Sequence, residues 1–502
     1  MASFSRERCY RSSMGWDDET CYRALAARDN RFDGLFFVGV TTTGIYCRPV
    51  CTARTPGRSR CRFYSNASLA EREGFRPCLR CRPELAPGHA PVDSVQWTAR
   101  VAAGRIEAGA LNNGGGVESL ARELGLSSRQ LRRAVCREFG VSPVELAQTQ
   151  RLLLAKQLLA ETGLSVIEVA LTSGFESVRR FNSLFRSHYG LTPSRMRRSS
   201  AARGDLGRLR LTLAFRPPFA WKPLLRFLAD RATAGVECVV DGAYLRTVEV
   251  DGCRGWFKVE PIVGRNALAV ELATSLTPAL TTILFRLRNL FDLNARPDVI
   301  ASHLAKDARI SQWVAACPGL RVPGAFDGFE LAVRAVLGQR ISVKAATALA
   351  GRLAAAFGEP IETPFPSLNR LSPSADRLAN VAPIELSRLG ISSARSITIG
   401  ELARAVAGQE IVLEPGLEPH SVVKQLMELP GIGAWTAQYI AMRALRWPDA
   451  FPEGDLGLRK AFSADSAREL LDAAEAWRPW RSYAAIYLWE SLRTVECEEC
   501  DD

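Results

Sequence analysis

The sequence contains no uninterrupted run of about 18 or more apolar residues, the length that a membrane-spanning helix needs. Its first residues, MASFSRERCYRSS, lack the apolar stretch of a secretory signal. The 13 cysteines are odd in number and irregularly spaced, which argues against a secreted disulfide framework. We therefore expect a cytoplasmic protein without a membrane partner, which uses its thiols for metal binding and reactivity.

A charge excess is also missing from the larger, C-terminal part of the chain. Residues 201–502 hold 35 basic and 35 acidic side chains, whereas residues 1–200 hold 30 Lys and Arg against 18 Asp and Glu. The net charge of +12 therefore lies entirely in the first 200 residues, and nearly all of it is arginine. Because guanidinium groups suit phosphate oxygens and guanine edges, this part is expected to bind nucleic acid. A generally basic, solvated surface is the alternative.

A chain of 502 residues is too long for one core, so three or four domains are expected. A Gly-rich stretch at 108–116 predicts a loop, and helical periodicity runs over 117–198. Alternating apolar residues predict strands at 209–215 and 268–272 with an amphipathic helix between them, and 277–492 reads as helical. The expected domains are 1–90, 91–200, 207–290 and 291–502.

Four cysteines form two pairs: Cys47 with Cys51, and Cys78 with Cys81. A short C-x₂₋₄-C loop places two thiolates on one side of a metal, and two such loops close a tetrahedron around zinc. We therefore expect one Zn²⁺ bound by all four thiolates. A purely structural zinc site is one interpretation, and chemistry on DNA is the other. The sequence assigns no role to three further cysteines: Cys61, Cys497 and Cys500.

The segments TTTGIYCRPVC and FYSNASLAEREGFRPCLRC, within residues 15–88, closely resemble the N-terminal domain of the Ada family of DNA methylation-repair regulators. The resemblance implies irreversible methyl transfer from a DNA phosphate methyltriester to a zinc-bound thiolate. By position the acceptor is Cys47, with Cys51, Cys78 and Cys81 as the remaining ligands. Only the thiolate is nucleophilic, and zinc keeps a cysteine deprotonated. Methylation would reduce the negative charge of the site from −2 to −1, so the product should bind DNA more tightly.

Two helical pairs follow, with turns at Gly125 and Gly174 and with caps Ser127 and Ser128 before the second helix of the first pair. The pattern GFESVRRFNSLFRSHYGLTPSRMRR resembles the double helix-turn-helix domain of the AraC family. This implies that the second helix of each pair lies in a major groove of promoter DNA. A solvated helix face is the alternative for each candidate contact: Arg129, Arg132, Arg133, Ser177, Arg179 and Arg180.

The segment LPGIG lies between two amphipathic helices. Gly431 and Gly433 allow a tight turn whose backbone N–H groups can hold a DNA phosphate, and Asp455 follows in FPEGDLGL. This arrangement resembles the helix-hairpin-helix DNA glycosylases, specifically the AlkA branch of 3-methyladenine glycosylases. The resemblance covers about residues 208–492. Its further matches are FRPPFAWKPLLRFLADRA, FDGFELAVRAVLGQRISV and WRPWRSYAAIYLW.

The resemblance implies that Asp455 stabilises the oxocarbenium-like sugar and assists the attacking water. A flipped alkylated base is cationic and suits aromatic walls, and three residues match pocket positions: Trp435, Tyr439 and Trp480. Core packing is the alternative for these rings. Trp435 stands where bifunctional members carry a Schiff-base lysine, so we expect excision without strand cleavage. The chain departs from the AlkA pattern at two positions. Arg340 stands where AlkA has an apolar wedge residue, and Leu456 stands where AlkA has an aromatic residue after the catalytic aspartate.

We therefore expect a multidomain, mainly α protein. It comprises a small zinc-bound α/β module, a helical double helix-turn-helix domain, and an α+β glycosylase half with a small antiparallel sheet and a helix-hairpin-helix bundle. The expected function is alkylation repair of double-stranded DNA with transcription regulation, by a nucleoid-associated monomer that contacts RNA polymerase. Two alternatives stay open. One is a regulator whose glycosylase half only grips DNA, and the other is a redox or metal sensor.

Overall fold

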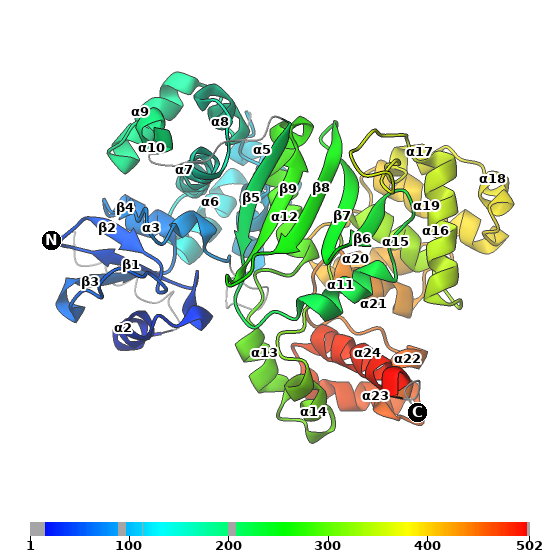
Figure 1. The fold of residues 1–502 in the computed structure, drawn as a ribbon. Helices are drawn as coiled ribbons and strands as arrows, with labels where there is room; N and C mark the ends of the chain where they lie inside the picture. Colours follow the sequence, from blue (N-terminus) through cyan, green and yellow to red (C-terminus); the bar gives the residue numbers. More distant parts are fainter. Residues whose placement is uncertain (1–15, 89–96, 113, 199–206, 499–502) are drawn as a thin grey trace. The chain divides into compact units, whose positions relative to one another are not determined.

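The computed structural model describes residues 16–88, 97–112, 114–198 and 207–498, and the chain divides into two compact units (Figure 1). The first unit contains Met1–Pro217 and Ile262–Phe285, and the second contains Pro218–Pro261 and Arg286–Asp502. The predicted mainly helical, multidomain class is confirmed. No helix in the described part of the chain is long and apolar enough to cross a membrane. Cys500 and the side chain of Cys497 lie outside the described residues.

The first unit begins with a small α/β module. Its elements are α2 (Asp18–Ala27), β1 (Phe37–Val40), β2 (Ile45–Cys47), β3 (Cys61–Tyr64), α3 (Ala67–Arg72) and β4 (Arg76–Pro77). The strands form one sheet in the order β3-β1-β2-β4, in which β2 and β4 run parallel with Tyr46 opposite Pro77. Parallel pairing brings the ends of these two strands to the same edge, so Cys47 and Cys78 lie side by side.

Helices follow the module within the same unit: α4 (Trp97–Glu107), α5 (Val117–Glu123), α6 (Ser128–Phe139), α7 (Pro143–Glu161), α8 (Val166–Thr172), α9 (Val178–Tyr189) and α10 (Pro193–Arg198). The predicted helical pairs are α5 with α6 and α8 with α9. Gly125 and Gly174 have φ of +66° and +84° at their turns, where a β-carbon would be strained. Ser127 caps α6 through a reciprocal capping box with Gln130. The long helix α7 connects the two pairs (Figure 1).

The strands predicted from alternating apolar residues are confirmed. In the first unit β5 (Arg208–Ala214) pairs antiparallel with β9 (Ala267–Ala273), and η4 (Thr274–Ala279) follows, before α12 (Leu280–Leu290), within which the first unit ends at Phe285. The predicted amphipathic helix is α11 (Trp221–Ala229) of the second unit. In the second unit three more strands form an antiparallel meander that the sequence analysis did not include: β6 (Glu237–Val240), β7 (Ala243–Val250) and β8 (Cys253–Pro261).

The rest of the second unit is helical. Its helices are α13 (Pro297–Leu304), α14 (Ala308–Ala316), α15 (Gly328–Leu337), α16 (Val343–Phe357), α17 (Ala375–Ala379), α18 (Pro383–Arg388), α19 (Ser393–Ala407), α20 (Pro419–Glu428), α21 (Ala434–Arg443), α22 (Leu456–Phe462), α23 (Ala467–Ala474) and α24 (Arg481–Glu498). Helix α21 packs on both α15 and α20. The pair α20 and α21 is the predicted hairpin.

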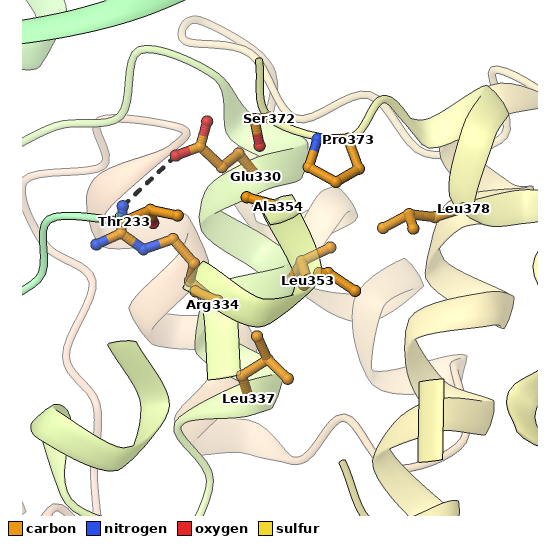
Figure 2. Close-up of a pocket in the computed structure, with 11 residues that line it drawn as sticks. Thr233, Glu330, Arg334, Leu337, Leu353, Ala354, Ser372, Pro373 and Leu378 are labelled. Atoms are coloured by element: carbon orange, nitrogen blue, oxygen red, sulfur yellow. Dashed lines mark hydrogen bonds and ion pairs between the residues drawn. The ribbon is translucent and has the colours of Figure 1, made fainter. Parts of the chain in front are cut away.

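Buried charges fix α15 to the meander of the second unit. Arg246 of β7 donates to Glu330 of α15 at 2.7 Å and to Glu237 of β6 at 3.1 Å, and Arg334 of α15 donates to Glu237 at 3.0 Å. Figure 2 shows the cavity beside this network, where Glu330 and Arg334 pair with each other next to Thr233. Two cations and two anions therefore neutralise one another, which favours a structural role for this seam.

Candidate zinc site and catalytic pocket

The four predicted cysteines meet at one point. Their sulfur atoms all lie within 4.8 Å of one another, and no other metal-ligating cluster is found among the described residues. A tetrahedral zinc with Zn–S bonds of about 2.3 Å separates its sulfurs by about 3.8 Å, which lies within the limit that these four sulfurs keep. Cys61 lies outside the cluster. The four thiols fit one Zn²⁺, which Cys47, Cys51, Cys78 and Cys81 would hold.

Backbone donors complete the surroundings of the thiolates. The amide of Arg48 donates to the Cys81 sulfur at 3.3 Å, and the amide of Arg80 donates to the Cys78 sulfur at 3.4 Å. The side chain of Arg48 is buried, donates to Asp33 at 2.8 Å and reaches the Cys81 carbonyl at 3.1 Å. Although burial opposes it, Asp33 holds the pKa of Arg48 above its ordinary value. Arg48 is therefore a structural arginine of the metal site.

Each of the four thiols affects the proton affinity of its neighbours through hydrogen bonds. Hydrogen bonds from Cys47 lower the pKa of Cys78, and the hydrogen bond with Cys51 raises the pKa of Cys47. Four crowded thiols cannot all release their protons without a cation, because each thiolate repels the next. Zinc supplies that positive charge and keeps cysteine ligands deprotonated. Cys47 is 9% exposed, so a reactive sulfur here is largely screened from water.

The predicted DNA contacts lie on the exposed faces of α6 and α9. All six candidate side chains are exposed: Arg129, Arg132, Arg133, Ser177, Arg179 and Arg180. Arg132 forms an exposed ion pair with Glu118 at 3.2 Å, which is worth little in water and can be exchanged for a phosphate. Ser177 caps α9 by accepting from the amide of Arg180. Both α6 and α9 therefore present cationic side chains to solvent.

The hairpin between α20 and α21 has the geometry of a phosphate site. Gly431 has φ of +84°, and a β-carbon there would lie 2.1 Å from the hydroxyl oxygen of Thr398. Gly433 begins α21 without any side-chain cap, and its surroundings are open. The first N–H groups of α21 are thus available to an anion at the positive end of the helix.

Arg340 lies beside this hairpin. It is exposed and adopts φ of +56°, an unusual conformation for a residue with a β-carbon. The preceding residue, Gln339, donates to the Gly431 carbonyl at 2.9 Å and to the Thr436 hydroxyl at 3.1 Å. The loop from α15 to α16 is thereby held at the hairpin with the Arg340 side chain directed to solvent. This position suits a side chain that enters a DNA duplex.

Asp455 is the N-cap of α22 and lies at the centre of a group of donors. Its Oδ1 accepts from the Leu458 amide at 2.8 Å and from the Trp489 indole N–H at 3.0 Å. Its Oδ2 accepts from the Trp435 indole N–H at 2.9 Å. Because all three groups donate, both oxygens are fixed as acceptors and the carboxylate is held in one orientation. Leu456, directly after it, is 76% exposed.

An aromatic stack adjoins this carboxylate. The rings of Trp435 and Tyr439, one turn apart on α21, lie parallel at 5.3 Å, and Trp489 meets Tyr439 edge-on at 6.2 Å. Arg443 donates to the Tyr439 hydroxyl at 2.8 Å. Although burial opposes it, Arg443 and Arg231 hold the pKa of Tyr439 below its ordinary value. A hollow lined by Phe227, Arg231 and Trp489 among others lies within the same unit.

Family models match four successive parts of the chain. They are the metal binding domain of Ada over residues 20–84, a helix-turn-helix domain over 120–199, the AlkA N-terminal domain over 210–327, and the HhH-GPD superfamily base excision DNA repair protein over 333–473. The probable bifunctional transcriptional activator/DNA repair enzyme AlkA of Mycobacterium tuberculosis is 40% identical over 489 residues, which cover 95% of this chain and 97% of that protein. The chain belongs to this bifunctional AlkA family.

Two more similarities concern the glycosylase part of this AlkA-family protein. DNA-3-methyladenine glycosylase 2 of Escherichia coli is 35% identical over 278 residues, which cover 55% of this chain and 96% of that protein. The structure of a 3-methyladenine DNA glycosylase from Archaeoglobus fulgidus matches with 20% identity and a TM-score of 0.47, covering 55% of this chain and 96% of that one. The helix-turn-helix and hairpin parts make the chain a DNA-binding protein.

The structure separates the three predicted pocket aromatics. Trp435 and Tyr439 lie together at Asp455. Trp480 is 4% exposed and meets Tyr483 edge-on. Among the described residues, no hydrogen bond or ring contact joins Trp480 to the other two aromatics. Trp435 and Tyr439 therefore lie together at the carboxylate, whereas the ring contact of Trp480 is with Tyr483, and its place in the pocket stays a prediction.

The further ring at the carboxylate is Trp489, which was not predicted from the sequence. The segment WRPWRSYAAIYLW, which ends at Trp489, contained a signal for it. Helix α24 begins at Arg481, so Trp480 precedes this helix, whereas Trp489 lies about two turns into it. A prediction of where the helix begins would have separated the two tryptophans and made Trp489 a second candidate.

Proposed function

We propose that this AlkA-family protein excises alkylated bases of the 3-methyladenine type by hydrolysing the N-glycosidic bond. The observation that carries the proposal is the Asp455 carboxylate, held by the indole N–H groups of Trp435 and Trp489 beside a stacked Tyr439. Aromatic faces suit a flipped, cationic base, and the fixed carboxylate suits the positive charge that develops on the sugar. The relatives named for 3-methyladenine excision support the same reaction.

In the proposed reaction the base leaves with the electron pair of the glycosidic bond, and water adds to the sugar carbon while Asp455 receives its proton. Trp435 occupies the start of α21, and its indole cannot form the Schiff base that strand cleavage needs. We therefore assign a monofunctional glycosylase that leaves the strand intact. The hairpin residues Gly431 and Gly433 would hold a phosphate, and Arg340 would fill the gap left by the flipped base.

We propose a second, stoichiometric activity at the zinc site, in which Cys47 accepts a methyl group from a DNA methylphosphotriester. The carbon–oxygen bond breaks, a sulfur–carbon bond forms, and the phosphate oxygen keeps the electron pair. The match to the metal binding domain of Ada and the four gathered thiolates support this proposal. Zinc bound there would keep the Cys47 sulfur anionic and nucleophilic.

We further propose that the protein works as a nucleoid-associated monomer with the four domains 1–90, 91–200, 207–290 and 291–502. The exposed arginines of α6 and α9 would contact a promoter, where the protein would engage RNA polymerase. The name of the M. tuberculosis relative supports a role in transcription activation.

The excision proposal is tested with wild type and Asp455→Asn on methylated duplex DNA. We expect wild type to release 3-methyladenine without breaking the strand, and Asp455→Asn to be slower by at least about 100-fold, since a general base contributes roughly that much. Trp480→Phe is the control and should act like wild type. Equal release by Asp455→Asn would remove the catalytic role of the carboxylate. No release by either protein would favour a regulator whose second half only grips DNA.

A further inference from the structure

The zinc module does not hold its ligand loops by itself. Lys156, on α7 of the double helix-turn-helix, donates from its ammonium group to the backbone carbonyl of the ligand Cys78 at 3.3 Å and also pairs with Glu84. Lys156 is 2% exposed and Glu84 is equally enclosed. Lys156 is also the only lysine among the first 200 residues, a segment that is otherwise rich in arginine. A compact ammonium group thus lies behind the second cysteine pair.

A second link joins α7 to the end of the same cysteine loop. Arg82, directly after the ligand Cys81, pairs with Glu161 near the end of α7 at 2.9 Å and with Glu84 at 3.0 Å. Arg82 adopts φ of +53°, so the chain turns sharply where it leaves the metal site. Lys156, Glu84, Arg82 and Glu161 therefore form one continuous chain of ion pairs across the interface.

A third link reaches the first cysteine pair. Glu71 of α3 accepts from the hydroxyl of Tyr46, the residue before Cys47, at 3.0 Å and from the hydroxyl of Thr149 on α7 at 2.7 Å. His188 of α9 approaches the same carboxylate at 3.7 Å. Thr149 and Lys156 are seven residues apart, so they lie on one face of α7. This face contacts the segments that lead to both cysteine pairs, and α7 packs on α3 (Figure 1).

These links are energetically significant because they are buried. Moving α7 away from the ligand loops would leave the Lys156 ammonium and the Glu84 carboxylate without partners in a dry interface, which strongly disfavours that movement. Metal binding orders the loops, and loss of the metal frees them to move. A change at the zinc site therefore changes the energy of an interface that includes the helix joining both recognition units.

We propose that Lys156 is a positioning residue of the zinc site supplied by the DNA-binding domain, through which zinc retention and DNA binding by α6 and α9 are thermodynamically coupled. Linkage makes the coupling reciprocal: DNA that favours the ordered α7 slows zinc loss, and zinc favours DNA binding. The inference needs only the zinc site and DNA binding, and it stands apart from base excision and methyl transfer.

The test measures zinc transfer from the full chain to a chromophoric chelator, with and without a saturating undamaged DNA duplex. We expect Lys156→Met to lose zinc at least about 10-fold faster than wild type, and DNA to slow the loss in wild type but not in this variant. Lys156→Arg keeps the charge and should recover part of the difference. The matched control Lys222→Met removes an exposed lysine from α11 of the second unit and should leave zinc loss unchanged.

Two results would overturn the proposal: zinc loss from Lys156→Met at the wild-type rate, or full protection of this variant by DNA. If Lys156→Met does not fold, Glu161→Gln breaks the link through Arg82 without touching a ligand residue. That variant should accelerate zinc loss to a smaller extent, and an unchanged rate would contradict the coupling. Base release by each variant serves as the folding control for the second unit.

Discussion

The zinc site and the proposed base pocket at Asp455 are assembled in different ways. All four zinc ligands lie within 35 residues, and one parallel strand pair with two short loops brings them together. The groups around Asp455 come from α21, α22 and α24, and Trp489 is 34 residues away from the carboxylate that it holds. The zinc ligands are therefore brought together mainly by nearby segments of the chain, which α7 braces, whereas Asp455 and its donors meet only when the helical core of the second unit is complete.

Removal of zinc should give the largest difference between the two sites, because a structural zinc ion contributes on the order of 10 kcal/mol to the stability of the fold that binds it. With a chelator we expect amide protection to be lost over residues 16–88 and retained over 333–473. Hydrogen exchange with mass spectrometry measures both regions in one sample, while base release in parallel should stay unchanged. Loss of excision on chelation would show that the pocket depends on the metal module.

Substitution of the two tryptophans sharpens the assignment of the pocket. Trp489→Phe keeps an aromatic ring but removes the N–H donor to Asp455, and a hydrogen bond to a charged group is worth about 1.5–3 kcal/mol. We expect kcat for 3-methyladenine release to fall about 10- to 100-fold. Trp480→Phe is the matched control and should change kcat less than about twofold. A larger fall in kcat for Trp480→Phe than for Trp489→Phe would show that Trp480, and not Trp489, is the tryptophan of the pocket.

The two units should also differ in their response to pH. Burial raises the pKa of Glu71 to about 7, so the folded first unit binds a proton more tightly than the unfolded chain and loses stability as the pH rises from about 4.5 to 7. Glu237 behaves in the opposite way. Although burial opposes it, Arg334 and Arg246 hold its pKa below the ordinary value, so its contribution is lost only as the pH falls below about 4.5.

Between pH 5 and 8, Glu71→Gln should therefore gain stability relative to wild type by up to about 3 kcal/mol. Hydrogen exchange of peptides from α3 and α7, corrected for its intrinsic pH dependence, measures the free energy of opening. Peptides from β6, which carries Glu237, provide the internal control and should show no pH dependence in this range. If the difference in the free energy of opening between wild type and Glu71→Gln does not change with pH in this range, the raised pKa of Glu71 is contradicted.

The smallest expected effect on stability concerns Arg340. Glycine tolerates φ of +56° without strain, so Arg340→Gly should leave thermal stability unchanged or raise it by up to about 1 kcal/mol. Excision from duplex DNA should nevertheless fall several-fold, since no side chain remains to fill the gap in the duplex. Excision from single-stranded DNA is the comparison and should be unaffected. Equal losses on both substrates would exclude a role as a wedge.

The features of the structure that could be predicted from the sequence are those that depend on residues close together in the chain. The cysteine spacing, the alternation in β5 and β9 and the cap at Ser127 each act within a few residues, and these predictions of structure are confirmed, although Ser128 is the first residue of α6 and not a cap. The strand β7 was missed because it is buried on both faces and shows no alternation. The structural role of Arg48 was missed because its partner, Asp33, is 15 residues away in sequence.

Long-range pairing also explains the difference at the aromatic positions. A family pattern indicates that several tryptophans occur near the end of the chain, but only packing of α24 against α22 decides which of them meets Asp455. Likewise, no local pattern indicates that Lys156 reaches the backbone of Cys78, 78 residues away. Contacts of this kind depend on how whole helices pack against one another. Patterns of residues that are close in sequence carry no information about that packing.

The most direct test places both proposed chemistries in one reaction. Wild type and Asp455→Asn are incubated with methylated duplex DNA, released bases are quantified, and the methylated cysteine is located by peptide mass spectrometry. We predict that Asp455→Asn releases at least about 100-fold less 3-methyladenine and still carries a methyl group on Cys47, as wild type does. Undiminished base release by Asp455→Asn, or a methyl group on a different cysteine, would contradict this account.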